Sequence, residues 1–290
     1  MQSKKILITG ANGQLGKELQ RLSSNYPGFD YFFRSRQELP IEDKKQVDEF
    51  FHDVKPDYCI NCGAYTAVDK AESERDMAFL INGDAVGFLS NASKATACKL
   101  IHVSTDYVFD GTSSTPLKET DATRPINIYG ESKLKGELLA AQHNNETLII
   151  RTAWVYSSFG NNFVKTMIRL MRERDSINVV NDQIGSPTYA AGLADAIMKI
   201  VSNEHFIPGI YNYSDEGKIS WFDFAIAIKE LIGAKCTVNP IPTSQYPTPA
   251  KRPHYSLLDK TKIRTTYGIA IPAWESNLVE CINQIRKNEV

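Results

Sequence analysis

Residues 10–16 read GANGQLG; they follow the apolar run KILIT (residues 5–9) and precede a segment with helical periodicity. In such a turn one glycine permits the tight bend, a second lets the backbone approach a diphosphate, and a third permits close packing of helix on strand. The N-terminus of the following helix offers unpaired N–H groups to phosphate oxygens. The spacing is G-x-x-G-x-x-G, so a plain glycine-rich turn remains an alternative. The stretch predicts a strand–turn–helix unit that binds a dinucleotide.

The first half of the chain continues this alternation. Helix-like segments separate four further strand-like runs, at residues 29–33, 57–62, 99–104 and 147–156. Strands that alternate with helices predict an α/β fold, with a doubly wound parallel sheet of the Rossmann type that is covered by helices on both faces.

The second half has a looser pattern. It contains helix-like segments, a strand-like run GIYNYS (209–214) and a proline-rich stretch at 240–253 for which we expect no regular structure. We expect residues 1–156 to form a dinucleotide-binding domain and residues 157–290 to form mainly a smaller C-terminal substrate-binding lobe, with some later segments returning to the first domain.

Composition excludes several classes of protein. The chain has 290 residues, a formal net charge of -1 and 42% hydrophobic residues, which is ordinary for a globular protein and gives no bulk charge for nucleic acid or membrane. We see no signal-peptide pattern or membrane span, so the cytoplasm is the expected location. Five scattered cysteines argue against a disulfide framework. Cys59 and Cys62 form a C-x-x-C, but they lie in a strand-like run without a second ligand pair, so we expect no metal.

The sequence FFRSRQE ends the second predicted strand. It has Arg34, Ser35 and Arg36 where NAD-preferring proteins carry an acidic residue. Two cations and a hydroxyl suit a 2′-phosphate, so the sequence favours NADPH, with NADH as the alternative. The alternative is that Arg34 and Arg36 are simply solvated surface residues.

Two polar motifs follow later strands. STDYVFDG (104–111) begins where the fourth predicted strand ends, and YGESK (129–133) places Tyr129 and Lys133 on one face of a helix. Such a tyrosine donates a proton to a carbonyl oxygen as hydride reaches the carbon, and a nearby lysine cation is expected to lower its pKa. A polar turn and an ordinary helix surface are the respective alternatives.

Together these motifs resemble the extended short-chain dehydrogenase/reductase family and, within it, the dTDP-4-dehydrorhamnose reductases. The segments GANGQLG, AYTAVDKAE, STDYVFDG, YGESKLKGE, RTAWVY and DQIGSPTY carry the resemblance over residues 10–189, and RP with SLLD extends it to residue 259. The resemblance implies NAD(P)H-dependent reduction of the C4 keto group of dTDP-4-dehydro-L-rhamnose to dTDP-L-rhamnose. A nucleotide-sugar epimerase or dehydratase, and a non-catalytic subunit such as that of methionine adenosyltransferase, remain alternatives, and a homodimer is left open.

The resemblance also implies roles for single residues. Thr105, Tyr129 and Lys133 would be catalytic, with Tyr129 as the proton donor. Tyr129 and Lys133 would also contact the cofactor, together with Gly10, Asn12, Gly13, Gln14, Leu15, Gly16, Arg34, Ser35, Ile41, Ala64, Tyr65, Thr66 and Val103. The substrate would meet Val68, Thr105, Asp106, Trp154 and Arg252, with Lys251 nearby. A core aromatic is the alternative for Trp154, and solvated charge is the alternative for Lys251 and Arg252.

The chain departs from the family pattern at two positions. Relatives often carry acids where this sequence has Ser35 and Pro40. Of the roles that the resemblance implies, the contacts to the adenosine end of the cofactor are therefore the least secure. Some relatives bind magnesium at a dimer interface through glutamates that have no assignable counterparts here, so no metal is transferred.

Overall fold

The computed structural model describes residues 3–203 and 205–288, so the outermost ends of the two expected domains lie outside the described residues. Its centre is a six-stranded sheet in which all neighbouring strands are parallel. The order across the sheet is β10 (Gly209–Asn212), β5 (Thr147–Thr152), β4 (Lys99–Thr105), β3 (Tyr58–Asn61), β1 (Lys4–Thr9) and β2 (Phe29–Arg34). The prediction of a doubly wound parallel sheet is confirmed.

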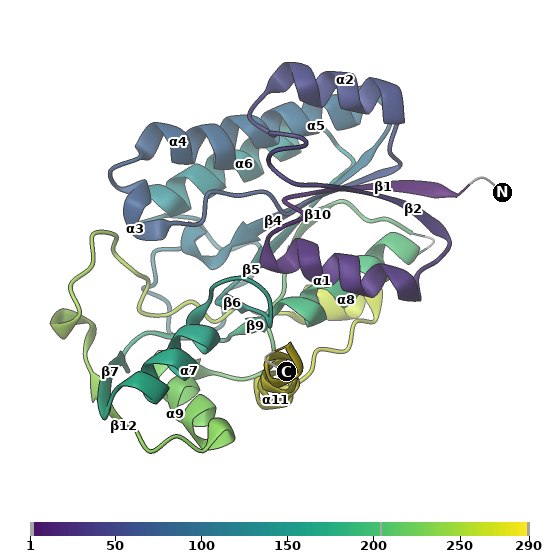
Figure 1. Ribbon diagram of the computed structural model, residues 1–290. Coiled ribbons are helices and arrows are strands. Elements are labelled where there is room, and N and C mark those ends of the chain that lie inside the picture. The colour runs from purple at the N-terminus through teal and green to yellow at the C-terminus, as the bar shows by residue number, and fades with distance from the viewer. Residues whose placement is uncertain (1–2, 204, 289–290) are drawn as a thin grey trace.

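Helices cover both faces of this sheet (Figure 1). One face packs against α1 (Gln14–Leu22) and α8 (Ala190–Ser202), and the other against α2 (Lys44–Val54), α5 (Ala85–Ala95) and α6 (Ile128–His143). The sequence of β1 explains the two layers, because Ile6 and Ile8 join the first apolar cluster whereas Leu7 joins the second. Successive side chains of a strand point to opposite faces, so a buried central strand must be apolar throughout.

The second half of the chain forms a smaller lobe with its own apolar cluster. The elements of this cluster are α7 (Phe163–Glu173), α9 (Trp221–Ile232), α11 (Trp274–Asn288), and the parallel pair β7 (Ser176–Val180) and β12 (Thr237–Ile241). Two short pairs connect the lobe to the sheet: β6 (Val155–Tyr156) with β9 (Thr188–Tyr189), and β8 (Ile184–Gly185) with β11 (Ile219–Ser220). The remaining helices are α3 (Val68–Ala71), α4 (Arg75–Phe79) and α10 (Thr261–Tyr267).

The structure corrects two sequence-based expectations. Residues 147–156 are not one strand, because Trp154 adopts φ +48° and separates β5 from β6. The proline-rich stretch is not wholly irregular, because Pro240 and Ile241 belong to β12. A strand in a two-stranded sheet has a free edge, where the missing N–H of proline is tolerated. Between α4 and α5 the chain forms a π-helix, Leu80–Asp84, so the segment is helical throughout.

The run GIYNYS forms a strand as expected, and the structure places it in the main sheet. β10 pairs with β5, so a strand from the second half completes the sheet of the first. None of the helices in the described part of the chain has both the length and the apolar character needed to cross a membrane.

Candidate active site

The strand order reverses next to β1, since the chain runs from β1 outward to β2 and then returns to β3 on the other side of β1. Ligands of doubly wound sheets bind at the carboxyl ends of strands at such a reversal. Here Gly10 follows β1 with φ +64°, and a Cβ built on it would lie 2.7 Å from the backbone nitrogen of Gly63. Only glycine fits this turn, because the loops after β1 and β3 touch there.

The N-terminus of α1 opens beside this turn. Its N-cap is Gly13, which supplies no side-chain cap, and its first turn contains no acidic residue. A Cβ on Gly16 would lie 2.6 Å from the carbonyl oxygen of Gly10, so this glycine lets the helix pack against the turn. The uncapped N–H groups and a first turn without an acidic residue fit a diphosphate.

A cavity of about 480 Å³ lies at this end of the sheet. The predicted cofactor residues that line it are Gly10, Asn12, Gly13, Gln14, Leu15, Ile41, Ala64, Thr66, Val103, Tyr129 and Lys133. The structure thus brings the glycine turn and the Tyr–Lys pair to one cavity, although they are more than one hundred residues apart in the sequence.

The cations after β2 differ in their surroundings. The Arg34 guanidinium lies 5.2 Å from the ring centre of Phe50, and its Nη1 donates to the carbonyl of Phe33; Arg34 does not line the cavity. Arg36 lines it and pairs with Glu42 at 2.6 Å. Ser35 is buried and donates its hydroxyl to Glu38, at 2.7 Å. The geometry therefore favours Arg36 over Arg34 and Ser35 as the group nearest a cofactor phosphate.

Tyr65 is held by a residue that sequence reasoning missed. The side chain of Asn82, in the π-helix, accepts from the N–H of Tyr65 at 2.8 Å and donates to its carbonyl at 3.0 Å. The same amide donates to the Ser132 hydroxyl of α6, at 3.0 Å. Asn82 is fully buried, so this network fixes the loop after β3 against the helix that carries the catalytic pair. In the sequence Asn82 is one polar residue of a helix-like segment, which gave little signal.

The YGESK motif begins α6. Asn127 caps the helix by accepting from the N–H of Gly130 at 2.7 Å, so Tyr129 lies in the first turn and Lys133 one turn later. A Cβ on Gly130 would lie 2.2 Å from the carbonyl oxygen of Tyr107, which explains the glycine between Tyr129 and its lysine partner. The Lys133 ammonium donates to the carbonyl of Val103 at 2.7 Å.

Burial sets the proton affinities of the pair. It lowers the pKa of Lys133 to about 8, partly opposed by the nearby Glu137. Burial also raises the pKa of Tyr129 to about 12, although a hydrogen bond with the Thr105 hydroxyl opposes the rise. The pKa of Tyr129 is raised and not lowered as the sequence led us to expect, because desolvation of the phenolate dominates. Tyr129 therefore remains protonated at neutral pH, the state that a proton donor needs.

The end of β4 supplies the neighbouring polar groups. Thr105 donates to Asp106 at 3.0 Å, and both residues are buried. Burial raises the pKa of the Asp106 carboxyl to about 6, against the opposing effect of hydrogen bonds from Ser256 and Thr105. Thr105 therefore bonds a predicted substrate residue and lies near the predicted proton donor Tyr129.

A buried ion pair supports this end of the sheet. Arg151 of β5 contacts Glu137 of α6 through three hydrogen bonds, at 2.7, 3.0 and 3.3 Å. The Ser104 hydroxyl donates to the same carboxylate at 2.6 Å. Because Glu137 lies one turn beyond Lys133, the pair fastens the catalytic helix to the sheet.

The predicted substrate residues lie around the lobe side of the site. The Trp154 ring stacks on Trp221, the first residue of α9, with 3.7 Å between ring centres. Sequence reasoning missed Trp221, whose position at a helix start gave little signal. Arg252 forms a two-point ion pair with Asp69, at 2.8 and 3.0 Å, and Asp69 follows Val68 in α3. The proline-rich segment is therefore fastened to the first domain by Arg252, whereas Lys251 is exposed.

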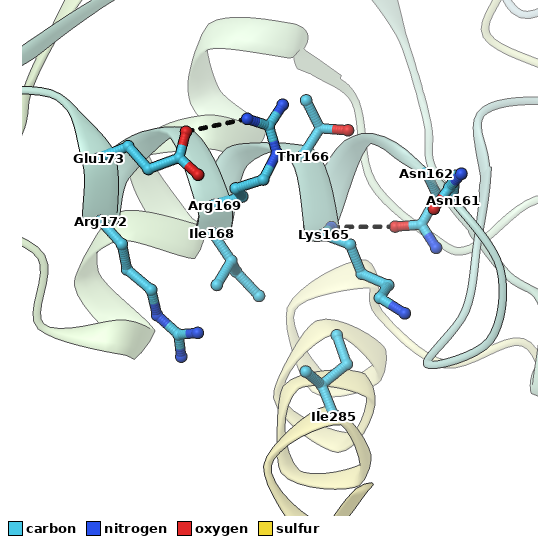
Figure 2. Close-up of a pocket in the computed structure, with 9 residues that line it drawn as sticks. All are labelled: Asn161, Asn162, Lys165, Thr166, Ile168, Arg169, Arg172, Glu173 and Ile285. Carbon is cyan, nitrogen blue, oxygen red and sulfur yellow. Dashed lines mark hydrogen bonds and ion pairs between the residues drawn. The ribbon is translucent and has the colours of Figure 1, made fainter. Parts of the chain in front are cut away.

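A second cavity, of about 440 Å³, lies between α7 and α11 (Figure 2). Lys165 and Arg169 line it from α7, and Ile285 lines it from α11. None of the predicted site residues borders this cavity. Asn161 borders both cavities, so the loop before α7 separates them.

Comparisons with known proteins agree with this geometry. Residues 4–287 match the family model described as RmlD substrate binding domain. The dTDP-4-dehydrorhamnose reductase of Aggregatibacter actinomycetemcomitans is 42% identical over 284 residues, covering 94% of this chain and 97% of that protein. The chain belongs to the dTDP-4-dehydrorhamnose reductase family.

A solved member of this family agrees closely in structure. The dTDP-4-dehydrorhamnose reductase of Bacillus anthracis str. Ames, in complex with NADP, has 40% identity and a TM-score of 0.94, covering 98% of this chain and 100% of that one. The UDP-glucose 4-epimerase of Thermus thermophilus has a TM-score of 0.82 but 18% identity, over 97% and 99% of the two chains, which shows the shared fold alone. Membership of the reductase family identifies the chain as an oxidoreductase and disfavours the epimerase and regulatory-subunit alternatives.

Proposed function

We propose that the protein reduces the C4 keto group of dTDP-4-dehydro-L-rhamnose to give dTDP-L-rhamnose, with NADPH as the cofactor. The observation that carries the proposal is that Tyr129 and Lys133 line a cavity whose other end is an uncapped glycine cradle, with Thr105 near Tyr129 at the end of β4. Family membership supports the same reaction, because the similar proteins are named as reductases of this sugar nucleotide.

The residues present fit a dinucleotide, whose nicotinamide supplies hydride when it is bound. Gly13, Gln14 and Leu15 would hold the diphosphate at the start of α1. Arg36 would meet the 2′-phosphate, exchanging its partner Glu42 for the anion, which supports NADPH as the preferred cofactor. Val103 lines the cavity beside Lys133, where it would lie under the nicotinamide.

The chain's own chemistry is proton delivery and orientation. Tyr129, which stays protonated because burial raises its pKa to about 12, would donate its proton to the C4 oxygen as that oxygen gains charge. Thr105 would share the same oxygen, since it lies near Tyr129 at the end of β4. The Lys133 cation would bind the nicotinamide ribose and stabilise the phenolate that remains.

The substrate side of the proposal rests on position. Asp106 adjoins Thr105, and the Trp154 ring presents a flat surface stacked on Trp221. Val68 lies in α3 and Arg252 lies in the proline-rich segment, on the two sides of the contact between them. There the diphosphate of the substrate would replace Asp69 as the partner of the Arg252 guanidinium. The cytoplasmic location, the homodimer and the absence of nucleic-acid binding remain predictions.

The decisive experiment offers the purified protein dTDP-4-dehydro-L-rhamnose with NADPH or NADH and follows nicotinamide oxidation. We expect turnover with both cofactors and a higher kcat/KM with NADPH. Absence of turnover with either cofactor contradicts the proposal. Purification with tightly bound oxidised cofactor would instead favour an epimerase or dehydratase.

A further inference from the structure

The loop Ser157–Asn162 connects β6 to α7 and forms part of the wall of the cofactor cavity. Gly160 and Asn161 line that cavity together with the glycine turn. The loop is fastened to α1 of the other half of the chain, because the Ser157 hydroxyl donates to the buried Glu18 carboxylate at 2.6 Å. Gly160 has φ +65°, and a Cβ built on it would lie 3.1 Å from Cγ of Gln14. The lobe therefore reaches across the start of the diphosphate-binding helix.

Asn162 is the centre of this contact. Its Oδ1 accepts from the N–H of Lys165 at 3.1 Å and caps α7, as the dashed line in Figure 2 shows. Its Nδ2 donates to the carbonyl of Ser157 at 2.7 Å and to Oε1 of Gln14 at 2.9 Å. A side-chain amide has two N–H donors, so these bonds, with a longer one to the carbonyl of Phe159 at 3.4 Å, use both of them.

The bond to Gln14 orients a group that faces the cofactor. Gln14 is the first residue of α1 and lines the cavity. Its carbonyl oxygen is taken by Asn162, whereas its NH₂ group makes no hydrogen bond to any residue in the ranges 3–203 and 205–288. The oxygen and the NH₂ group of a planar amide point in different directions, so fixing the oxygen also fixes the two remaining donors. These donors lie where the uncapped helix favours an anion.

We propose that Asn162 is a positioning residue for cofactor binding. It holds the Gln14 amide with its oxygen toward the lobe, so that the NH₂ group of Gln14 donates to the diphosphate of the bound dinucleotide. The inference rests on the proposed function, since it requires a diphosphate at α1. It extends that function, because one side chain of the lobe, 148 positions from Gln14 in the sequence, then contributes to cofactor affinity.

The test is a double-mutant cycle on NADPH affinity, measured by calorimetry without substrate. Asn162→Ser keeps a good helix cap but removes both N–H donors. We expect it to raise the NADPH Kd about tenfold, the loss of one hydrogen bond to a charged group. In a Gln14→Ala background the same substitution should change the Kd less than about twofold, because the group that it orients is absent.

Two controls keep the result interpretable. Asn91→Ser removes an exposed side-chain amide that pairs with His143, away from the cavity, and should leave the Kd unchanged. Thermal unfolding of cofactor-free Asn162→Ser should match the wild type within a few degrees, because the cap is preserved. An equal loss of affinity in both Gln14 backgrounds, or no loss in either, overturns the inference while wild-type binding upholds the proposed function. A wild-type protein that binds no NADPH overturns both.

Discussion

Replacing Lys133 by methionine should stabilise the cofactor-free fold while it removes activity. Burial lowers the pKa of Lys133 from 10.5 to about 8. At about 1.4 kcal/mol per pKa unit, the charged side chain therefore lowers the free energy of unfolding by about 3 kcal/mol at neutral pH. Methionine fills a similar volume without charge but leaves the Val103 carbonyl without its donor, a loss of about 1 kcal/mol. The net gain is about 2 kcal/mol, or roughly 4–8 °C in Tm.

The pH dependence gives this prediction its sign. Between about pH 8 and 10.5 the unfolded chain holds the Lys133 proton that the folded protein has lost, so the wild type gains stability as pH rises through this window. The advantage of Lys133→Met should therefore be full below about pH 8 and shrink toward pH 10.5. Urea unfolding of the cofactor-free proteins, followed by tryptophan fluorescence at both ends of the window, measures the difference.

Lys135→Met is the matched control. Lys135 lies two residues along α6, is partly exposed and pairs with Asp84 at the surface, so its loss should change the free energy of unfolding by less than about 1 kcal/mol. The reasoning is refuted if Lys133→Met is less stable than the wild type at pH 7. It is equally refuted if the difference between the two proteins stays constant up to pH 10.5.

Three further predictions concern the reaction and the fold. Tyr129→Phe should lower kcat, measured by stopped flow, by at least about 100-fold, because it removes the proton donor. The NADPH Kd, measured by calorimetry, should stay within about threefold of the wild-type value. Retention of full turnover would exclude Tyr129 as the donor. Arg36→Ala should lower the ratio of kcat/KM for NADPH to that for NADH about tenfold. Arg34→Ala should leave this ratio unchanged, because the Arg34 guanidinium lies against Phe50. The opposite ranking would assign the phosphate contact to Arg34. Glu137→Ala should destabilise the fold by about 3–5 kcal/mol in urea unfolding, because it leaves the Arg151 cation buried and unpaired; a loss below about 1 kcal/mol would show that this pair is not a major support of the fold.

The sheet and its order along the chain were predictable from local patterns. Continuous apolar runs such as KILIT mark buried parallel strands, and the glycine turn after the first strand marks the point where the two loops meet. The family resemblance supplied the candidate roles of Thr105, Tyr129 and Lys133. The structure places Tyr129 and Lys133 on the cavity, with Thr105 near Tyr129 at the end of β4.

The remaining features depend on contacts between distant residues. Asn82 reads as one polar residue in a helical pattern, and only the packed loop after β3 shows what its amide bonds. The left-handed backbone of Trp154 follows from its stack on Trp221, 67 positions later. The raised pKa of Tyr129 reflects burial, which the spacing of tyrosine and lysine does not contain.

The origin of β10 has a consequence for synthesis of the chain. β5 ends at Thr152, yet the strand that covers its edge ends at Asn212, and α8, which packs on α1, ends at Ser202. On the ribosome α1 therefore keeps an exposed apolar face until residue 202 has been translated, and the sheet keeps an open parallel edge until residue 212 has been translated. An open strand edge pairs readily with other chains. A fragment that stops at residue 156 should therefore aggregate, so the dinucleotide-binding half needs the later half to fold.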